Sequence, residues 1–374
     1  VIGAMLGKLI ADSGAAQRIV TTLMNQFGKR YIVWALVITG FIVGIPLFYG
    51  IGFVLMVPLI ITLSYKYDIP AVYIGLPMLA SLSVTHGYLP PHPSPVALVS
   101  QYHADLGLTL LYGFIAAIPT IIIAGPVFSL TLKKYKQKPL ATFAGKTMAE
   151  EDMPGLADSL ITALLPVVLI ALATIVKLFS ASTSIPAKII IALGDPVVAL
   201  LITLLYALYA LVLKKGKKIE PCMISLGEAV KDIAMILLII AGAGALKQIL
   251  TDSGTEHQIA AAMTGFSKHP ILAAWGIAAF IRVCLGSATV AGLTAAGIVA
   301  PMLAGSSVSP SLIVLATGAG SLMFSHVNDG GFWMFKEYFN LSIKDTIKTW
   351  SLMETIVSIV GLIAVLGINF VISH

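Results

Sequence analysis

The sequence predicts an all-α polytopic membrane protein with inverted structural repeats, each containing a re-entrant hairpin and a broken transmembrane helix. Hydrophobic residues make up 58% of the 374 residues and charged residues only 11%, a balance that water-soluble globular proteins of this size do not have. Apolar runs of about 20 residues, the length of a transmembrane helix, recur along the chain. A proline-rich interruption predicts the broken helix, and an internal repeat in the sequence predicts the structural repeats.

The interruption runs from Val84 to Pro95 and reads VTHGYLPPHPSP. A helix cannot continue through Pro90, Pro91 and Pro93, because proline lacks the amide donor and clashes with the preceding turn. Apolar sequence continues on both sides, and unwound backbone at membrane depth must be buried in protein or line a wet cavity. We therefore expect a binding site at this break. An ordinary extramembrane loop is the alternative.

The second half of the chain repeats the first. GALKQILTDSG at 244–254 resembles GAMLGKLIADSG at 3–14, at an offset of 240 residues between their ends. The same offset carries SLSVTH, which ends at His86, onto SLMFSH, which ends at His326. Chance similarity is the alternative, but two matches at one offset favour a structural repeat. Repeats of a hairpin and a broken helix are typical of transporters.

Apolar runs and polar interruptions divide the chain into segments. The chain starts inside an apolar run without a methionine, so we expect a further N-terminal segment. We expect a first repeat at 1–132, with a hairpin at about 31–65 and a broken helix at about 70–100. A cytoplasmic loop at 133–155 follows. The second repeat, at 156–374, is expected to contain scaffold spans at 156–250 (among them 156–180 and 187–213), a hairpin at about 270–304, a broken helix at about 310–340 and a last span at about 345–372.

Basic residues cluster in short polar loops at 29–30, 133–138, 214–218 and 344–348. If each hairpin re-enters on its own side, all four clusters fall on one face of the membrane, which the positive-inside rule makes cytoplasmic. The two helix breaks then descend from opposite sides, so the repeats are inverted and the site lies between them near the midplane. The clusters indicate topology, and we expect no nucleic-acid partner.

Three motifs together resemble the gluconate:proton symporter family (the GntP family) of the ion transporter superfamily: HGYLPPHPSP, LGSATVAG and SHVNDGGFWMFKEYFNLS. The resemblance covers essentially the whole chain. It implies a proton-coupled importer of gluconate or a related sugar acid in the bacterial inner membrane, usually a homodimer with scaffold and transport domains. The sequence departs from the family at Gly50, where many members carry an acidic or amide side chain. The resemblance therefore assigns no role to the first hairpin tip.

A sugar acid presents one carboxylate and several hydroxyls, so its site needs a donor-rich pocket for the anion and neutral polar groups for the polyol. Broken helix ends and a small-residue hairpin tip can supply both. Helix capping at Ser94, Ser325 and Asn328, and helix–helix packing at the hairpin tip, are the alternatives. The predicted substrate-binding residues are Thr85, His86, Ser94, Arg282, Gly286, Ser287, Thr289, Ser325 and Asn328.

Arg282 lies in an apolar hairpin arm, where an unpaired charge is costly. It can anchor the substrate carboxylate through a two-pronged contact. The alternative is a structural role, either a fixed ion pair with Asp329 or hydrogen bonds to the carbonyls of a broken helix. Both interpretations stay open at the level of the sequence.

The coupling ion is expected to be a proton, because histidine titrates in the working range with little tuning. The predicted titrating residues are His86, His326 and Asp329, with His92 as a secondary candidate. Pairing with Arg282 would disqualify Asp329. Sodium is the alternative, since inverted-repeat symporters bind it with unwound carbonyls and hydroxyls. We expect no other cofactor.

Two further function classes are weaker alternatives. An intramembrane zinc hydrolase would use the histidines, but the sequence has no HExxH motif and prolines separate His86 from His92. A channel of the same fold is the other. Cys222 and Cys284 lie far apart in the sequence and indicate neither a disulfide nor a metal site.

Overall fold

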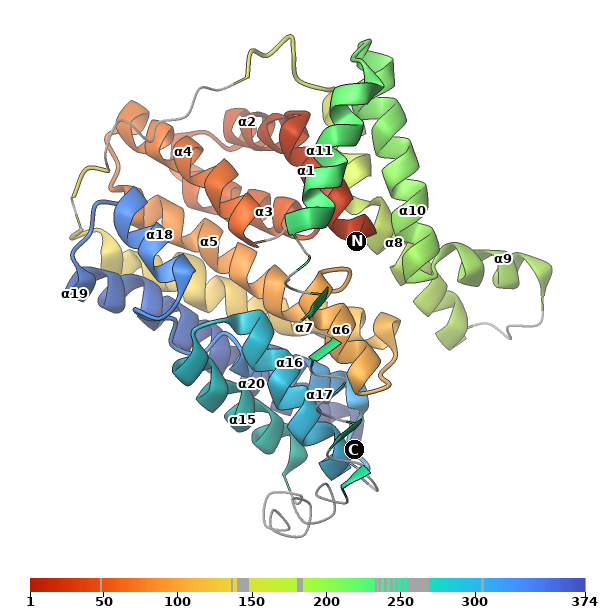
Figure 1. Cartoon of the computed structure of the whole chain (residues 1–374). Coiled ribbons are helices and arrows are strands. Elements are labelled where there is room, and N and C mark those ends of the chain that lie inside the picture. The colour runs from red at the N-terminus through yellow and green to blue at the C-terminus, as the bar shows by residue number, and fades with distance from the viewer. Residues whose placement is uncertain are drawn as a thin grey trace.

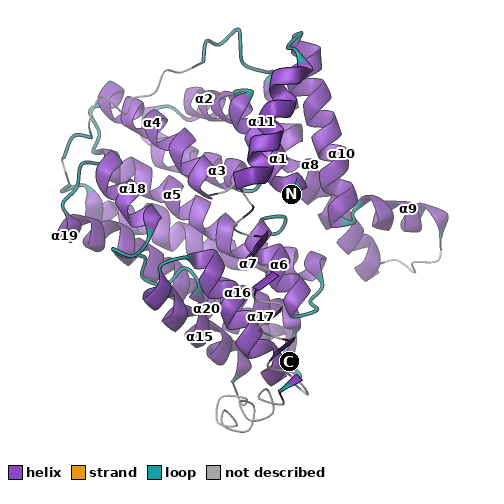
Figure 2. Cartoon of the chain, in the orientation of Figure 1, coloured by secondary structure: helices purple, strands orange, loops and turns teal. Residues whose placement is uncertain are grey.

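The computed structural model describes residues 1–47, 49–135, 137–139, 148–179, 184–232, 269–303 and 306–373, with scattered residues between 234 and 253. Over these residues the chain is helical and contains no strand, as predicted (Figure 2). The principal helices are α1 (Ile2–Asp12), α2 (Ala15–Phe27), α3 (Ile32–Gly44), α4 (Tyr49–Tyr67), α5 (Ala71–Tyr88), α6 (Pro93–Gln101), α7 (Leu106–Ile122), α8 (Leu156–Phe179), α9 (Ile185–Leu193), α10 (Pro196–Ala207), α11 (Ile219–Asp232), α15 (Pro270–Leu285), α16 (Ala288–Val299), α17 (Pro310–Gly320), α18 (Gly330–Tyr338), α19 (Ile343–Thr346) and α20 (Leu352–Ser373).

Five of the described helices are long and apolar enough to cross a membrane: Tyr49–Tyr67, Leu106–Leu132, Leu156–Lys177, Pro196–Lys215 and Ile343–Ser373. Several of them expose apolar stripes at helical spacing, such as Leu111, Ile115 and Ile118 on α7. Such stripes suit contact with lipid tails. The chain is a polytopic all-α membrane protein.

The order of helices from α3 to α7 recurs from α15 to α20. In each case two helices joined by a short turn precede a helix, a break, a short helix and a long span. The first break lies at 89–92, between α5 and α6, and the second at 321–329, between α17 and α18. The inverted relation of the two halves stays a prediction, and the repeat motif at 244–254 falls mostly outside the described residues.

Two helices form the centre of the fold. All of α5 except Tyr73 and His86 is buried, and so is all of α17 after Pro310. They approach closely at two glycines, since a Cβ on Gly318 would overlap the carbonyl oxygen of Gly87. Small residues at such a crossing allow two backbones to come into contact. The two broken helices are therefore packed directly against each other.

The remaining helices lie around this core. In Figure 1, α1, α8, α10 and α11 lie at the upper right, while α15 and α16 lie at the bottom. The region predicted as a single span at 187–213 is divided, because the helix breaks between α9 and α10. The cause is local: Asp195 caps α10 by accepting hydrogen bonds from the amides of Val197 and Val198, and Pro196 occupies its first turn.

The first hairpin, expected at about 31–65, has arms of unequal length. Its first arm, α3, has 13 residues, but α4 has 19 and is long enough to cross a membrane. The axis bends by 113° between α2 and the helix that begins at Lys29. Residues 15–27 thus turn sharply away from α3, as an interfacial helix would.

Candidate functional site

A cavity of about 400 Å³ lies where the two halves meet. Its walls come from the start of α4, the end of α5, the end of α15, the starts of α16 and α18, and the last span. Seven of the predicted site residues line it: His86, Arg282, Gly286, Ser287, Thr289, Asn328 and Asp329. The structure thus brings together residues separated by more than half of the chain.

Three helices begin at the cavity wall. The first residues of α4, α16 and α18 all line it. Ser287 caps α16 by accepting from the amide of Val290 at 3.4 Å, and Asp329 caps α18 by accepting from the amide of Gly331 at 3.0 Å. Helix N-termini carry partial positive charge and amides without intrahelical partners. The cavity wall is therefore suited to an anion.

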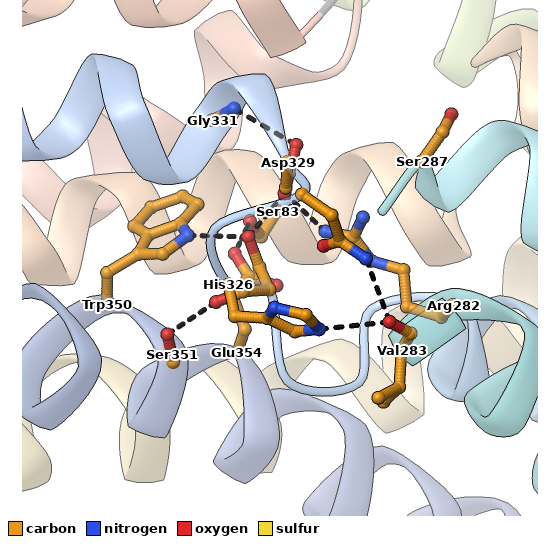
Figure 3. A network of polar contacts seen from close by, with 12 residues as sticks. Ser83, Arg282, Val283, Ser287, His326, Asp329, Gly331, Trp350, Ser351 and Glu354 are labelled. Atoms are coloured by element: carbon orange, nitrogen blue, oxygen red, sulfur yellow. Dashed lines mark hydrogen bonds and ion pairs between the residues drawn. The ribbon is translucent and has the colours of Figure 1, made fainter. Parts of the chain in front are cut away.

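Arg282 supplies a full positive charge. Its side chain is only 4% exposed, and Nη2 donates to Oδ2 of Asp329 at 2.5 Å (Figure 3). The Nε and Nη1 atoms are buried and have no hydrogen-bond partner in the described structure. A buried donor left without a partner is costly, so these two atoms are positioned to take a ligand acceptor.

Asp329 is held by several neighbours besides Arg282. The hydroxyl of Ser325 donates to Oδ2 of Asp329, and Ser325 in turn accepts from Nε1 of Trp350 at 2.8 Å. The hydroxyl of Ser351 donates to the backbone carbonyl of Ser325. Ser325 therefore connects the second helix break to the last span, and it does not itself line the cavity.

The other residues of the second break hold the end of α15. Nε2 of His326 and Nδ2 of Asn328 both lie within hydrogen-bond distance of the carbonyl oxygen of Val283, at 2.9 and 2.8 Å. Gly286, which ends α15, has a φ of +79°, and a Cβ there would overlap the carbonyl oxygen of Asn328. Only glycine fits this turn. His326 does not line the cavity.

The first break carries a pair of histidines. Nδ1 of His86 lies 3.3 Å from Nε2 of His92, and the same Nε2 lies 3.0 Å from the carbonyl oxygen of Leu47. His86 lines the cavity, whereas His92 is buried behind it at 2% exposure. The ring of Tyr49 packs edge-on against His86. This pair joins the cavity to the turn between α3 and α4.

Thr85 and Ser94 lie away from the cavity. The hydroxyl of Thr85 donates to the carbonyl oxygens of Ser81 and Leu82 in its own helix, and a Cβ on Gly44 would overlap it. Ser94 is buried in the first turn of α6. Neither residue lines the cavity, so the substrate contact that the sequence predicts for each of them has no support from its position.

Four cavity residues with polar side-chain atoms were not predicted from the sequence: Tyr49, Ser83, Trp350 and Glu354. Glu354 is only 2% exposed, and its Oε1 accepts a hydrogen bond from the hydroxyl of Ser83. Its Oε2 is buried and has no hydrogen-bond partner in the described structure. Glu354 is the single acidic residue of the apolar helix α20, and this is the signal that marks it.

No group of three or more metal-ligating side chains comes together among the described residues. Both cysteines are free thiols. The cavity also contains Gly50, where a Cβ would meet no atom within 4 Å. The departure from the family pattern at this position therefore leaves open space at the start of α4.

A family model and individual relatives of known name point to the same protein family. The model of the GntP family permeases matches residues 1–371. The chain is 52% identical over 371 residues to a high-affinity gluconate transporter of Escherichia coli, covering 99% of this chain and 85% of that protein. It is 49% identical over 370 residues to the Gnt-II system L-idonate transporter of the same organism, covering 99% and 84%.

A solved structure supports the fold. The YdaH transporter of Alcanivorax borkumensis, described as having an unusual topology, superposes with a TM-score of 0.72. The match covers 99% of this chain and 84% of that one, at 16% sequence identity. At this identity the likeness concerns the fold alone.

Proposed function

The chain belongs to the GntP family of permeases, and we propose that it imports gluconate or a closely related sugar acid across the bacterial inner membrane together with a proton. As a member of this family it is a multi-pass membrane transporter and not an enzyme. The named relatives transport gluconate or L-idonate. Both are monocarboxylates that carry several hydroxyl groups.

The observation that carries the proposal is the guanidinium of Arg282, a residue of the cavity wall, of whose three nitrogens only one has a hydrogen-bond partner among the described residues. Nη2 is paired with Asp329, while Nε and Nη1 have no partner among the described residues. Nε–H and Nη1–H lie on opposite sides of the guanidinium, so each can donate one charge-assisted hydrogen bond to a ligand oxygen. The substrate carboxylate therefore accepts from one of these two donors, beside the amides at the starts of α16 and α18.

The rest of the cavity suits a polyol. Ser287, Thr289 and Asn328 place neutral polar groups in its wall. Glycines at 286, 330 and 331 let the ligand approach the backbone closely. The volume of about 400 Å³ lies at the small end of the range for ligand pockets. A single six-carbon sugar acid fits this chemistry better than a large amphiphile does.

Among the predicted titrating residues, His86 and Asp329 line the cavity. Asp329 already balances the charge of Arg282 and caps α18. We therefore assign proton exchange between the cavity and the protein to His86, with His92 as its hydrogen-bond partner. His326, bound to the carbonyl of Val283, has no such access in our proposal.

Thermal shift of the purified protein with a ligand panel tests the proposal. We expect gluconate and its epimers to raise the melting temperature, because ligands that bind only the folded state stabilise it. Dicarboxylates of similar length, hexoses and uncharged polyols should have no effect. Stabilisation by dicarboxylates or neutral sugars, with aldonates inert, would overturn the substrate assignment.

A further inference from the structure

Glu354 is a buried carboxyl group that the function described so far does not use. It lies in the last span, it is 2% exposed, and it lines the cavity. Ser83 donates to Oε1, but Oε2 has no hydrogen-bond partner in the described structure. An ionised carboxylate in such a place is costly, and protonation removes that cost.

The charged groups around Glu354 come from several elements. Arg282 on α15 and Asp329 before α18 both interact with it electrostatically. The phenols of Tyr49 on α4 and Tyr88 on α5 are also close enough to interact with it. His86, on the same helix as Ser83, lines the same cavity. Glu354 thus faces one fixed positive charge, and Asp329 already neutralises that charge through its ion pair.

We propose that Glu354 holds the coupling proton, which His86 exchanges with the cavity, and that protonation of Glu354 is what allows the substrate anion to bind at Arg282. The inference rests on the proposed sugar-acid import and deepens it. With Glu354 ionised, the two carboxylates outnumber the single guanidinium, and an incoming anion meets a net negative cavity. With Glu354 protonated, the cavity is neutral before the anion enters, so anion binding is favoured.

Binding of the proton to Glu354 and binding of the substrate anion at Arg282 are thus linked by a single coupling free energy. If protonation of Glu354 strengthens binding of the anion, the anion must strengthen binding of the proton by the same factor. The apparent dissociation constant equals the intrinsic value divided by the protonated fraction. Above the pH at which Glu354 loses its proton, substrate affinity therefore falls up to about tenfold per pH unit.

The test compares wild type with Glu354→Gln, which keeps the shape of a protonated carboxyl but cannot release a proton. In proteoliposomes we expect the variant to keep counterflow exchange of labelled gluconate and to lose accumulation driven by a pH gradient. Its gluconate affinity should not change between acidic and alkaline pH. Accumulation at the wild-type level, or an unchanged pH dependence of affinity, would overturn the proposal.

Two further variants separate coupling from folding. Ser83→Ala removes the hydrogen bond to Oε1 but keeps the carboxyl group, so it should shift the pH at which affinity falls without abolishing accumulation. Glu228→Gln makes the same chemical change at an exposed residue paired with Lys231, and it should match wild type in every assay. If Glu228→Gln lost accumulation as Glu354→Gln does, the effect would not belong to the cavity and the proposal would fail.

Infrared titration without substrate distinguishes failure of this inference from failure of the proposed function. Wild type should show a buried carboxylic acid band that disappears as the pH rises, and Glu354→Gln should lack it. If the band is present while no sugar acid binds, the proton site stands and the proposed substrate is wrong. If wild type binds gluconate but shows no band that Glu354→Gln removes, the proton site is wrong.

Discussion

Arg282 and Asp329 form an ion pair, with Nη2 and Oδ2 2.5 Å apart, that joins the end of α15 to the start of α18. The sequence left two roles open for Arg282, a fixed ion pair or a substrate anchor. The geometry accommodates both, because one nitrogen is paired while Nε and Nη1 lack partners in the part of the chain that the structure describes. The structural and the binding role can therefore be separated by mutation.

Arg282→Gln is expected to abolish gluconate binding and to destabilise the protein. Removing one partner of a buried ion pair costs about 3–5 kcal/mol, because the other charge is left uncompensated. The double variant Arg282→Gln/Asp329→Asn removes both charges and should recover much of the melting temperature but no binding. Recovery of gluconate binding in the double variant would show that Arg282 acts only through Asp329.

Thr289→Val is expected to weaken gluconate binding about tenfold. The substitution keeps the shape of the side chain but removes a hydroxyl from the cavity wall, and losing one hydrogen bond to a buried polar ligand costs about 1–3 kcal/mol. Isothermal titration with gluconate measures the change. The matched control is Thr203→Val on α10, where the native hydroxyl donates to the carbonyl of Ala199. The gluconate affinity of this control should stay at the wild-type value.

Gly286→Ala is expected to lower the melting temperature and to prevent transport. The left-handed backbone alone costs a residue with a Cβ about 1–3 kcal/mol, and the new methyl group would overlap the carbonyl oxygen of Asn328. Gly276→Ala, in the middle of α15, is the control, because its Cβ would meet no atom within 4 Å. Equal melting temperatures for the two variants would contradict the described turn.

The first helix break could be predicted because proline acts locally, and the second because the internal repeat aligns it with the first. The prolines after Leu89 end α5, and the second break, at 321–329, is followed by α18 with Asp329 as its cap. Cavity residues on these breaks and on the tip of the second hairpin could therefore be predicted from the sequence. The break at Gly194–Asp195 carries an equally local signal, a cap followed by proline, and the span predicted at 187–213 passed over it.

Longer-range relations could not be predicted in this way. Ser83 and Glu354 are 271 positions apart, and nothing local connects them. Thr85 shows the converse: it lies next to His86 in the sequence, but the rotation of α5 turns it toward Gly44 and its own helix. Successive residues on a helix point about 100° apart, so a motif on a helix does not fix which side chains face a cavity.

A pH gradient alone is expected to drive gluconate uptake, without sodium. Sodium sites in this type of transporter use unwound carbonyls, but the carbonyl of Val283 already accepts from Asn328, and that of Leu47 lies beside His92. A monocarboxylate and one proton together carry no net charge, so uptake into proteoliposomes that are acidic outside should persist with the membrane potential clamped at zero. Accumulation that requires a sodium gradient and ignores the pH gradient would overturn proton coupling, because the titratable groups of the cavity would then have no part in it.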